Sequence, residues 1–343
     1  NKIIKKIGQN EGLCLDINSC HLQPYLPYPL LIKDNQMIFQ NTSFTKYGKI
    51  FSLNFDVNNN ISFNELKTNK NKIKKYNNLC NEKTIFIKNK NIMFTILYKK
   101  GSSLKNRKCL VYGYGSYGNI YESSYNANKF LTLCLLDFIV VITHISGDGK
   151  LGFNQRYNGM LDNKKNTFDD FIYICDYLVK NKFTTHDKMV IWGRSAGGLL
   201  IGSVLNKRPN ICKLAIMGVP FLTPLITMSS EKFPLGIESQ SEWGNTNNNK
   251  MKEYIKSYSP VDNIKPCGKY PNIFIYSNLN DTLTPYKEAM MYYNLMKEVE
   301  TFKNKEREIL FFIDDKFGHK QGTKYNDHNF VFSLIFNMML KFI

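Results

Sequence analysis

The sequence lacks any run of about 18 uninterrupted apolar residues, the length that a membrane-spanning helix needs. Its most apolar stretch, residues 130–145, contains Asp137 near its middle. The first six residues include three lysines but neither an initiator Met nor the apolar core of a signal peptide. These absences predict a cytoplasmic protein with no membrane partner, and the missing Met indicates a fragment.

Arginine is scarce among the basic residues. Only five arginines stand among the 46 Lys and Arg of this 343-residue chain, although its formal net charge is +18. Proteins that read nucleic acids depend on the bidentate guanidinium group, whereas here Lys alternates with Asn in stretches such as residues 67–78. The surplus charge therefore indicates a solvated basic surface, and we expect no nucleic-acid partner.

Closely spaced metal ligands are also missing. The eight cysteines are scattered singly without a C-x-x-C pair, and no Cys or His pair has the spacing of zinc ligands. Several of these cysteines lie in apolar runs, which is typical of buried free thiols in a reducing compartment. We expect no metal site.

The composition that is present, 43% hydrophobic residues with 24 Phe, is that of a globular protein. Residues 1–78 are β-rich, with short strands expected at 30–33, 36–40 and 50–57 and a polar linker at 58–78. From residue 79 to the end, strand and helix patterns alternate, which predicts one layered α/β domain over residues 79–343.

The clearest helix pattern covers residues 167–181, where apolar residues recur at spacings of three and four and Thr167 is placed to cap the first turn. Further helices are expected at 196–206, at 286–299 and from about residue 329. Strands are expected at 83–88, 93–98, 108–112, 138–144, 188–192, 214–218, 272–276 and 307–314.

A candidate nucleophile lies in residues 193–197 (GRSAG), directly after a predicted strand and directly before a predicted helix. A Ser on so sharp a turn needs small neighbours, because larger side chains would collide with adjacent strands. The helix that follows points its first amides at a forming oxyanion. Ser195 is therefore the candidate nucleophile.

A nucleophilic Ser needs a base and an orienting acid, in the chain order Ser, acid, His if the fold is an α/β-hydrolase. That order leaves two histidines, of which we favour His319, in a loop after a strand, over His328 at the start of the last helix. Asp281 follows a buried strand and is the candidate acid, although a loop Asp is also a common turn residue.

Residues 112–118 (YGYGSYG) are the candidate for a second oxyanion donor, because their glycines let the backbone approach a substrate. A phosphate-binding loop is the rival interpretation, but neither glycine-rich phosphate motif is present. An irregular turn without function is the third interpretation.

Seven blocks follow one another along the chain: YGYGSYG at 112–118, GRSAGGLL at 193–200, VPF at 219–221, EWGN at 242–245, YSP at 258–260, Asp281 and the Gly-His pair at 318–319. In these blocks and their order, the chain resembles the prolyl oligopeptidase family of serine peptidases, in particular its oligopeptidase B branch. The resemblance implies an α/β-hydrolase domain in which Ser195, Asp281 and His319 form the triad, with the Tyr114 hydroxyl and the Ala196 amide as the oxyanion hole. It also implies that residues 1–78 are the end of a truncated β-propeller, that short peptides are the substrates, and that no cofactor is needed.

The specificity residues depart from this branch, which looks for Arg or Lys before the cut. The branch carries acids at the positions of Ser239 and Ser241. Glu238 and Glu242 lie one step away, where each is either a compensating acid or a solvated one. Other departures fall at residues 146–150 (SGDGK), at Leu283 and at residues 320–322 (KQG).

The sequence thus predicts a serine endopeptidase with an altered preference for the residue before the cut (P1). The alternative is a catalytically weak relative that acts as an esterase or a binding protein.

Overall fold

The computed structural model describes residues 31–33, 36–41, 43–45, 49–55, 61–66, 79–121, 128–230, 239–266, 268–320 and 325–343. The chain divides into two compact units. One draws its described residues from 1–82, 97–101 and 122–135, and the other from 83–96, 102–121 and 136–343. Within the described ranges, no helix is long and apolar enough to cross a membrane.

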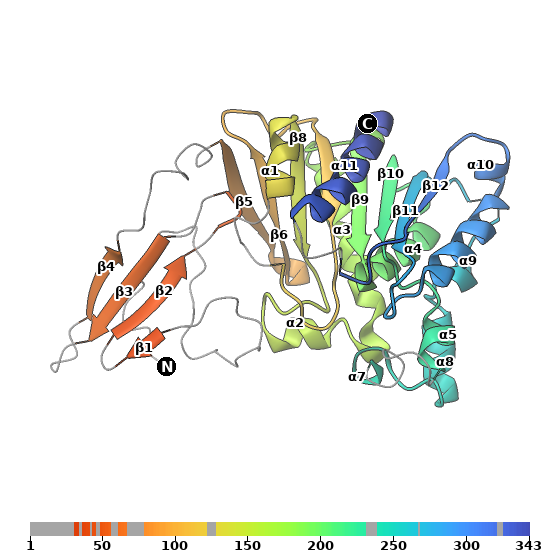
Figure 1. Ribbon diagram of the computed structural model, residues 1–343, viewed down its shortest axis with the longest axis horizontal. Helices are drawn as coiled ribbons and strands as arrows, with labels where there is room; N and C mark the ends of the chain where they lie inside the picture. The colour runs from red at the N-terminus through yellow and green to blue at the C-terminus, as the bar shows by residue number, and fades with distance from the viewer. Residues whose placement is uncertain are drawn as a thin grey trace. The chain divides into compact units, whose positions relative to one another are not determined.

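The smaller unit contains an antiparallel sheet of four strands in chain order (Figure 1). The three strands expected in this part of the sequence are present as β1 (Leu31–Lys33), β2 (Gln36–Asn41) and β3 (Lys49–Phe55). The fourth strand, β4 (Ile61–Leu66), lies inside the predicted linker, so the linker prediction is wrong there. Its sequence, ISFNEL, begins with the period-two alternation that a strand requires, hidden among Asn and Lys residues. Helix α1 (Asn128–Leu135) also belongs to this unit.

The second sheet has eight strands in the order β12-β11-β10-β9-β7-β8-β6-β5. The six strands from β12 to β8 are parallel. Such a sheet, flanked by helices, confirms the predicted α/β-hydrolase fold. The strands are β5 (Cys80–Ile87), β6 (Ile92–Lys99), β7 (Lys108–Tyr112), β8 (Phe138–His144), β9 (Met189–Arg194), β10 (Leu214–Gly218), β11 (Asn272–Asn278) and β12 (Ile309–Asp314).

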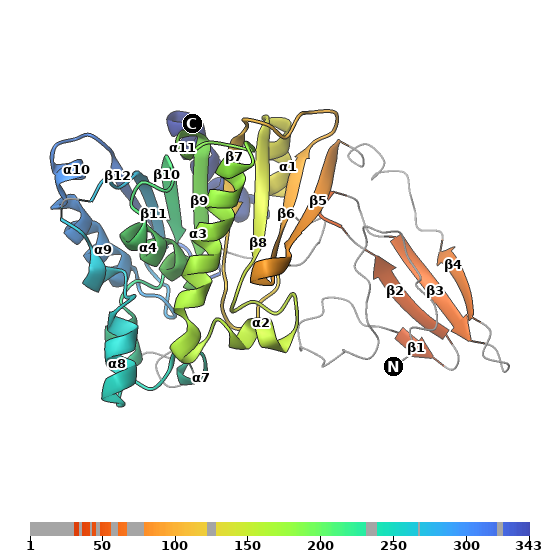
Figure 2. The same cartoon turned by 180° about the vertical axis from the view of Figure 1, so that it is seen from behind.

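Helices cover both faces of this sheet. Figure 2 shows α3 (Lys165–Lys180) and α4 (Ala196–Lys207) in front of the strands. Figure 1, seen from the opposite side, shows α11 (Tyr325–Phe342) in front of the other face of the sheet. Because both faces are covered, every residue of β8, β10 and β11 is buried, as expected for parallel strands. The other α-helices of the described chain are α2 (Phe153–Tyr157), α5 (Pro224–Met228), α7 (Gln240–Trp243), α8 (Asn249–Lys256), α9 (Tyr286–Lys297) and α10 (Glu300–Lys303).

The expected helix at residues 167–181 is present as α3, but it begins earlier, at Lys165. Thr167 is therefore inside the helix and does not cap it. Its side chain is buried, and its Oγ1 donates a hydrogen bond to the carbonyl of Ser146 at 2.8 Å. The prediction was wrong because a Thr that bonds a distant loop has the same sequence signature as a Thr that caps a helix.

The described cysteines match the prediction of buried free thiols. All are buried and none forms a disulfide within the described ranges: Cys80, Cys109, Cys134, Cys175 and Cys212.

Candidate active site

The parallel strands bring the four predicted parts of the site to one edge of the sheet. Tyr114 follows β7, Ser195 follows β9, Asp281 follows β11 and His319 follows β12. The carboxyl ends of parallel strands meet at the same edge, which is where ligands bind in open α/β sheets. The topology thus gathers residues that lie far apart in the sequence.

Ser195 adopts a strained backbone conformation between β9 and α4, with φ 58° and ψ −121°. A positive φ is costly for a residue other than Gly and persists only where the surroundings impose it. Here the Ser195 amide donates to the carbonyl of Gly218 at 2.8 Å, and the Ser195 carbonyl accepts from the amide of Phe221 at 3.1 Å. The turn therefore has the geometry of a nucleophile elbow.

The glycines on either side of Ser195 are required by space. A Cβ added to Gly193 would lie 2.1 Å from the carbonyl oxygen of Gly197. One added to Gly197 would lie 2.7 Å from the carbonyl oxygen of Gly113. The close approach of α4 to the loop after β7 thus explains why small residues flank the Ser, as the sequence predicted.

His319 bridges the candidate nucleophile and the candidate acid. Its Nε2 lies 3.1 Å from Ser195 Oγ and its Nδ1 lies 2.8 Å from Asp281 Oδ2. The His319 side chain is 17% exposed, whereas that of Asp281 is fully buried. The rival histidine, His328, has its backbone in the first turn of α11. The structure thus brings together the three side chains that the sequence singled out.

The Asp281 carboxylate is held by hydrogen bonds from its own turn. Its Oδ1 accepts the amides of Leu283 and Thr284, each at 2.9 Å, and its Oδ2 accepts the Thr284 hydroxyl at 3.0 Å. Burial by itself would raise the pKa of Asp281, but the hydrogen bond and charge of His319 and the two amides outweigh burial and lower this pKa below its ordinary value. The carboxylate is therefore ionised and able to orient the imidazole.

The loop that carries His319 is fixed to two strand ends by side chains that the sequence reasoning missed. Asn278, the last residue of β11, donates from Nδ2 to the carbonyl of Gly318 at 2.6 Å. Arg194, inside the elbow motif, donates from its guanidinium to the carbonyl of His319. Their positions at the ends of β11 and β9 were the available signal, because such residues face the same edge as the site.

The two candidate oxyanion donors meet at the first turn of α4: Ala196 belongs to this turn, and Tyr114 lies beside it. Ala196 is the first residue of this helix, so its amide has no acceptor within the helix. Tyr114 Cα lies 3.4 Å from the position of a Cβ added to Gly197. Burial, with a smaller contribution from Tyr117, raises the pKa of Tyr114 to about 12, so its hydroxyl keeps the proton it would donate.

The positions expected to select the substrate differ in their surroundings. Ser239 is buried with its Oγ 3.3 Å from the hydroxyl of Tyr117, whereas Ser241 is exposed. Glu242 is 1% exposed, and its Oε1 lies 3.4 Å from the Nζ of Lys164. Glu242 is thus a buried acid and not a solvated one: Lys164 balances its charge at Oε1, whereas its Oε2 has no hydrogen-bond partner among the described residues. Glu238 lies outside the described residues.

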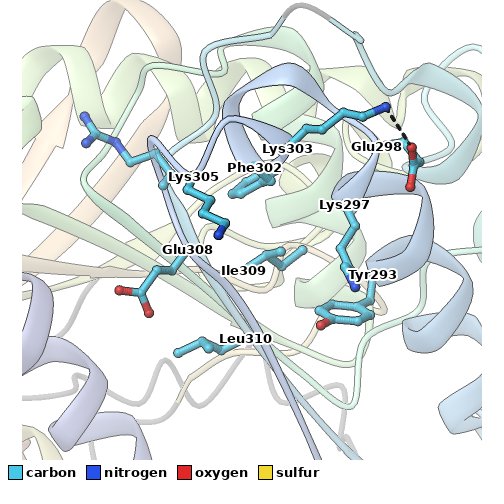
Figure 3. Close-up of a pocket in the computed structure, with 10 residues that line it drawn as sticks. Tyr293, Lys297, Glu298, Phe302, Lys303, Lys305, Glu308, Ile309 and Leu310 are labelled. Carbon is cyan, nitrogen blue, oxygen red and sulfur yellow. Dashed lines mark hydrogen bonds and ion pairs between the residues drawn. The ribbon is translucent and has the colours of Figure 1, made fainter.

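A hollow of about 410 Å³ lies between α9, α10 and β12 and contains none of the residues above (Figure 3). Its wall mixes both charges, from Lys297, Lys303, Lys305, Glu298 and Glu308. Glu298 is already paired with Lys303 at 3.4 Å. The hollow therefore presents no surface of one charge sign to a ligand, and it contains none of the proposed reactive groups.

The chemistry open to the site is that of an activated Ser. An ionised acid beside Nδ1 and a Ser hydroxyl beside Nε2 are the arrangement in which an imidazole accepts the Ser proton. Among the described residues, no group of three or more His, Cys, Asp or Glu is arranged to hold a metal ion.

Comparison with known proteins also indicates a serine peptidase. The sequence profile of the prolyl oligopeptidase family matches residues 123–339, which is more than half of the chain. Dipeptidyl aminopeptidase BI of Pseudoxanthomonas mexicana is 34% identical over 231 residues, which cover 66% of this chain and 31% of that protein.

Two solved structures of oligopeptidase B have the same fold. The enzyme from Leishmania major superposes with a TM-score of 0.80 at 30% identity, over 90% of this chain and 42% of that one. The enzyme from Trypanosoma brucei, solved in a closed form with covalently bound antipain, has a TM-score of 0.76 at 29% identity, over 90% and 43%. The chain thus spans less than half the length of these relatives.

Proposed function

The chain belongs to the prolyl oligopeptidase family, whose members act on peptides, and from this premise we propose that it is a serine endopeptidase that cleaves short peptides. The observation that carries the proposal is the pair of hydrogen bonds from His319, one to Ser195 and one to Asp281. The T. brucei relative was solved with covalently bound antipain, which supports a covalent step in the proposed reaction.

In this proposal, Ser195 Oγ attacks the carbonyl carbon of the scissile peptide bond while His319 Nε2 takes its proton. Asp281 accepts the Nδ1 proton of His319 and stabilises the imidazolium that forms. His319 then donates this proton to the leaving amine as the C–N bond breaks, and the acyl group stays bound to Ser195. A water molecule, deprotonated by His319, releases the acyl group and restores Ser195.

The tetrahedral intermediates carry a negative charge on the former carbonyl oxygen. We assign its stabilisation to the Tyr114 hydroxyl and the Ala196 amide. Donors that are fixed before the reaction need no reorganisation as charge develops, and losing one such donor costs about 100- to 1,000-fold in kcat. A Tyr hydroxyl is protonated at neutral pH, as a donor must be, and burial moves the pKa of Tyr114 further from neutral.

We further propose that the P1 preference for Arg or Lys is weak. A buried basic side chain needs a paired carboxylate. Ser239 and Ser241 replace the acids of the oligopeptidase B branch, and the charge of Glu242 is already taken by Lys164. In this proposal the chain keeps the triad of its family. Among the described residues, however, it has no acid with an uncompensated charge that would select a basic residue at P1.

Replacing Ser239 by Glu tests this preference, with peptides that differ only at P1, each prepared as an amide and as an ester. One restored charge pair is worth about a factor of 10 to 1,000. Ser239→Glu should therefore raise cleavage after Arg, relative to a neutral residue, at least about tenfold. Ser103→Glu, which adds the same charge at an exposed position between β6 and β7, is the matched control and should leave this ratio unchanged.

Two results would contradict these proposals. A parent protein that cleaves the esters but none of the amides would favour the esterase alternative. A parent already strict for Arg, and unaffected by Glu238→Gln and Glu242→Gln, would place the acidic pocket elsewhere.

A further inference from the structure

Lys164 is a buried cation that the proposed reaction does not use. It immediately precedes α3, and its side chain is 1% exposed. Its Nζ donates to the carbonyl of Gly115 at 2.8 Å and to the hydroxyl of Ser116 at 2.7 Å, and it lies 3.4 Å from Glu242 Oε1. The three protons of the ammonium group thus have three acceptors.

The surroundings of Lys164 keep it charged. Burial lowers the pKa of Lys164 to about 8, and the opposing effect of Glu242 prevents a larger decrease. The ammonium group also lies 4.4 Å from the centre of the Trp243 ring, a cation–π contact. Residues 242 and 243 thus provide a carboxylate and an aromatic face to one buried cation.

Glu242 and Trp243 also bond the segment that contains Gly115 and Ser116. We call residues 113–118 the glycine loop. Glu242 Oε1 accepts the amide of Tyr117 at 2.9 Å, and Trp243 Nε1 donates to the Tyr117 hydroxyl at 2.8 Å. Lys164 and Glu242 therefore contact each other, and each also bonds the glycine loop. Lys164 bonds residues 115 and 116, and Glu242 bonds residue 117.

The glycine loop has a backbone that needs such support. Gly115, Tyr117 and Gly118 have φ values of 68°, 60° and 66°. A positive φ is strained for Tyr117, which lacks the freedom of Gly. The conformation is therefore maintained by contacts from outside the loop.

Tyr114 lies between two anchors of this loop. Before it, the amide of Gly113 donates to the carbonyl of Trp192 at 3.1 Å. After it, the carbonyl of Gly115 accepts from Lys164. Its ring lies beside Gly197 in the first turn of α4, with Cδ2 3.5 Å from the position of a Cβ added there. Without the second anchor, the peptide groups that follow Tyr114 are free to rotate and move its ring away from this turn.

We propose that Lys164 and Glu242 form a buried ion pair that positions Tyr114 for oxyanion binding, by fixing the peptide groups that follow it. The inference rests on the proposed function, because it needs Tyr114 as an oxyanion donor. Lys164 and Glu242 are positioning residues here, since they act through Tyr114.

The test is a double-mutant cycle on the whole chain, measured as kcat and KM for one peptide. Lys164→Met should lower kcat about 10- to 100-fold, less than the loss of an oxyanion donor, and leave KM within about threefold. In a Tyr114→Phe background, the same change should lower kcat no further, because the hydroxyl it positions is absent. The control is Lys207→Met, which removes an exposed lysine paired with Asp169 and should leave both constants unchanged.

Lys164→Met leaves Glu242 buried without its cation, so thermal unfolding is followed by circular dichroism. If that variant does not fold, Lys164→Met combined with Glu242→Gln, which buries no unpaired charge, takes its place with the same expectations. A parental kcat in the folded variant, or losses that multiply in the Tyr114→Phe background, would overturn the inference while leaving the proposed function intact. A parent without peptidase activity would contradict the proposed function, and this inference with it.

Discussion

Replacing Ser195 by Ala is expected to lower peptide hydrolysis by at least about 10,000-fold, because members of such a triad act as a unit. Ala removes the nucleophilic oxygen that lies 3.1 Å from His319 Nε2 and leaves the elbow otherwise unchanged. The measurement is kcat/KM for a short fluorogenic peptide, with the amount of folded protein normalised by circular dichroism.

The two candidate histidines provide a matched control for that result. His319→Ala should cause a loss like that of Ser195→Ala, since it removes the base. His328→Ala should stay within a few-fold of the parent protein. The reverse pattern would show that the base had been wrongly assigned.

Asp281→Asn is the second large effect, expected to lower kcat about 10,000-fold, as removal of the orienting charge does in serine proteases. The carboxylate Oδ2 accepts the Nδ1 proton of His319 at 2.8 Å. An Asn whose amide nitrogen faces Nδ1 would donate instead, which moves the imidazole proton to Nε2, where the Ser195 proton must be accepted. Catalysis would then lose both the correct tautomer and the negative charge that stabilises the imidazolium.

The control for Asp281→Asn is Asp262→Asn, at an exposed position between α8 and β11. It makes the same chemical change away from His319 and should leave kcat unchanged. If Asp281→Asn retained more than about a tenth of the parental kcat, another group would have to orient His319, and the present assignment of the acid would be wrong.

Local patterns in the sequence predicted the elements that form the site. The strands expected at residues 108–112, 138–144 and 214–218 have the same bounds as β7, β8 and β10, because each is an apolar run with clear ends. The elbow at residues 193–197 could be located because its glycines, its strand and its helix are neighbours in the sequence. The family resemblance, which the profile match confirms, supplied the assignment of Tyr114; that assignment stays a prediction, since the match begins at residue 123.

The parts that could not be predicted depend on contacts between distant residues. Lys164 and Glu242 are 78 positions apart, and nothing in either local pattern distinguishes a buried ion pair from two solvated charges. Thr167 was misread for the same reason, because its partner is the carbonyl of Ser146 in another loop. Periodicity reports which face of an element is buried, but it does not identify the partner of a buried polar group.

The most direct test of the central claim, that Ser195 is an activated nucleophile, is labelling of the parent protein with a fluorophosphonate, followed by peptide mass mapping of the adduct. We predict one covalent adduct on Ser195, no labelling of Ser195→Ala, and strongly reduced labelling of His319→Ala, since the reagent reacts only with a Ser hydroxyl that a base deprotonates. Undiminished labelling of the Ser195→Ala variant, or a folded parent protein that takes no label, would contradict this account.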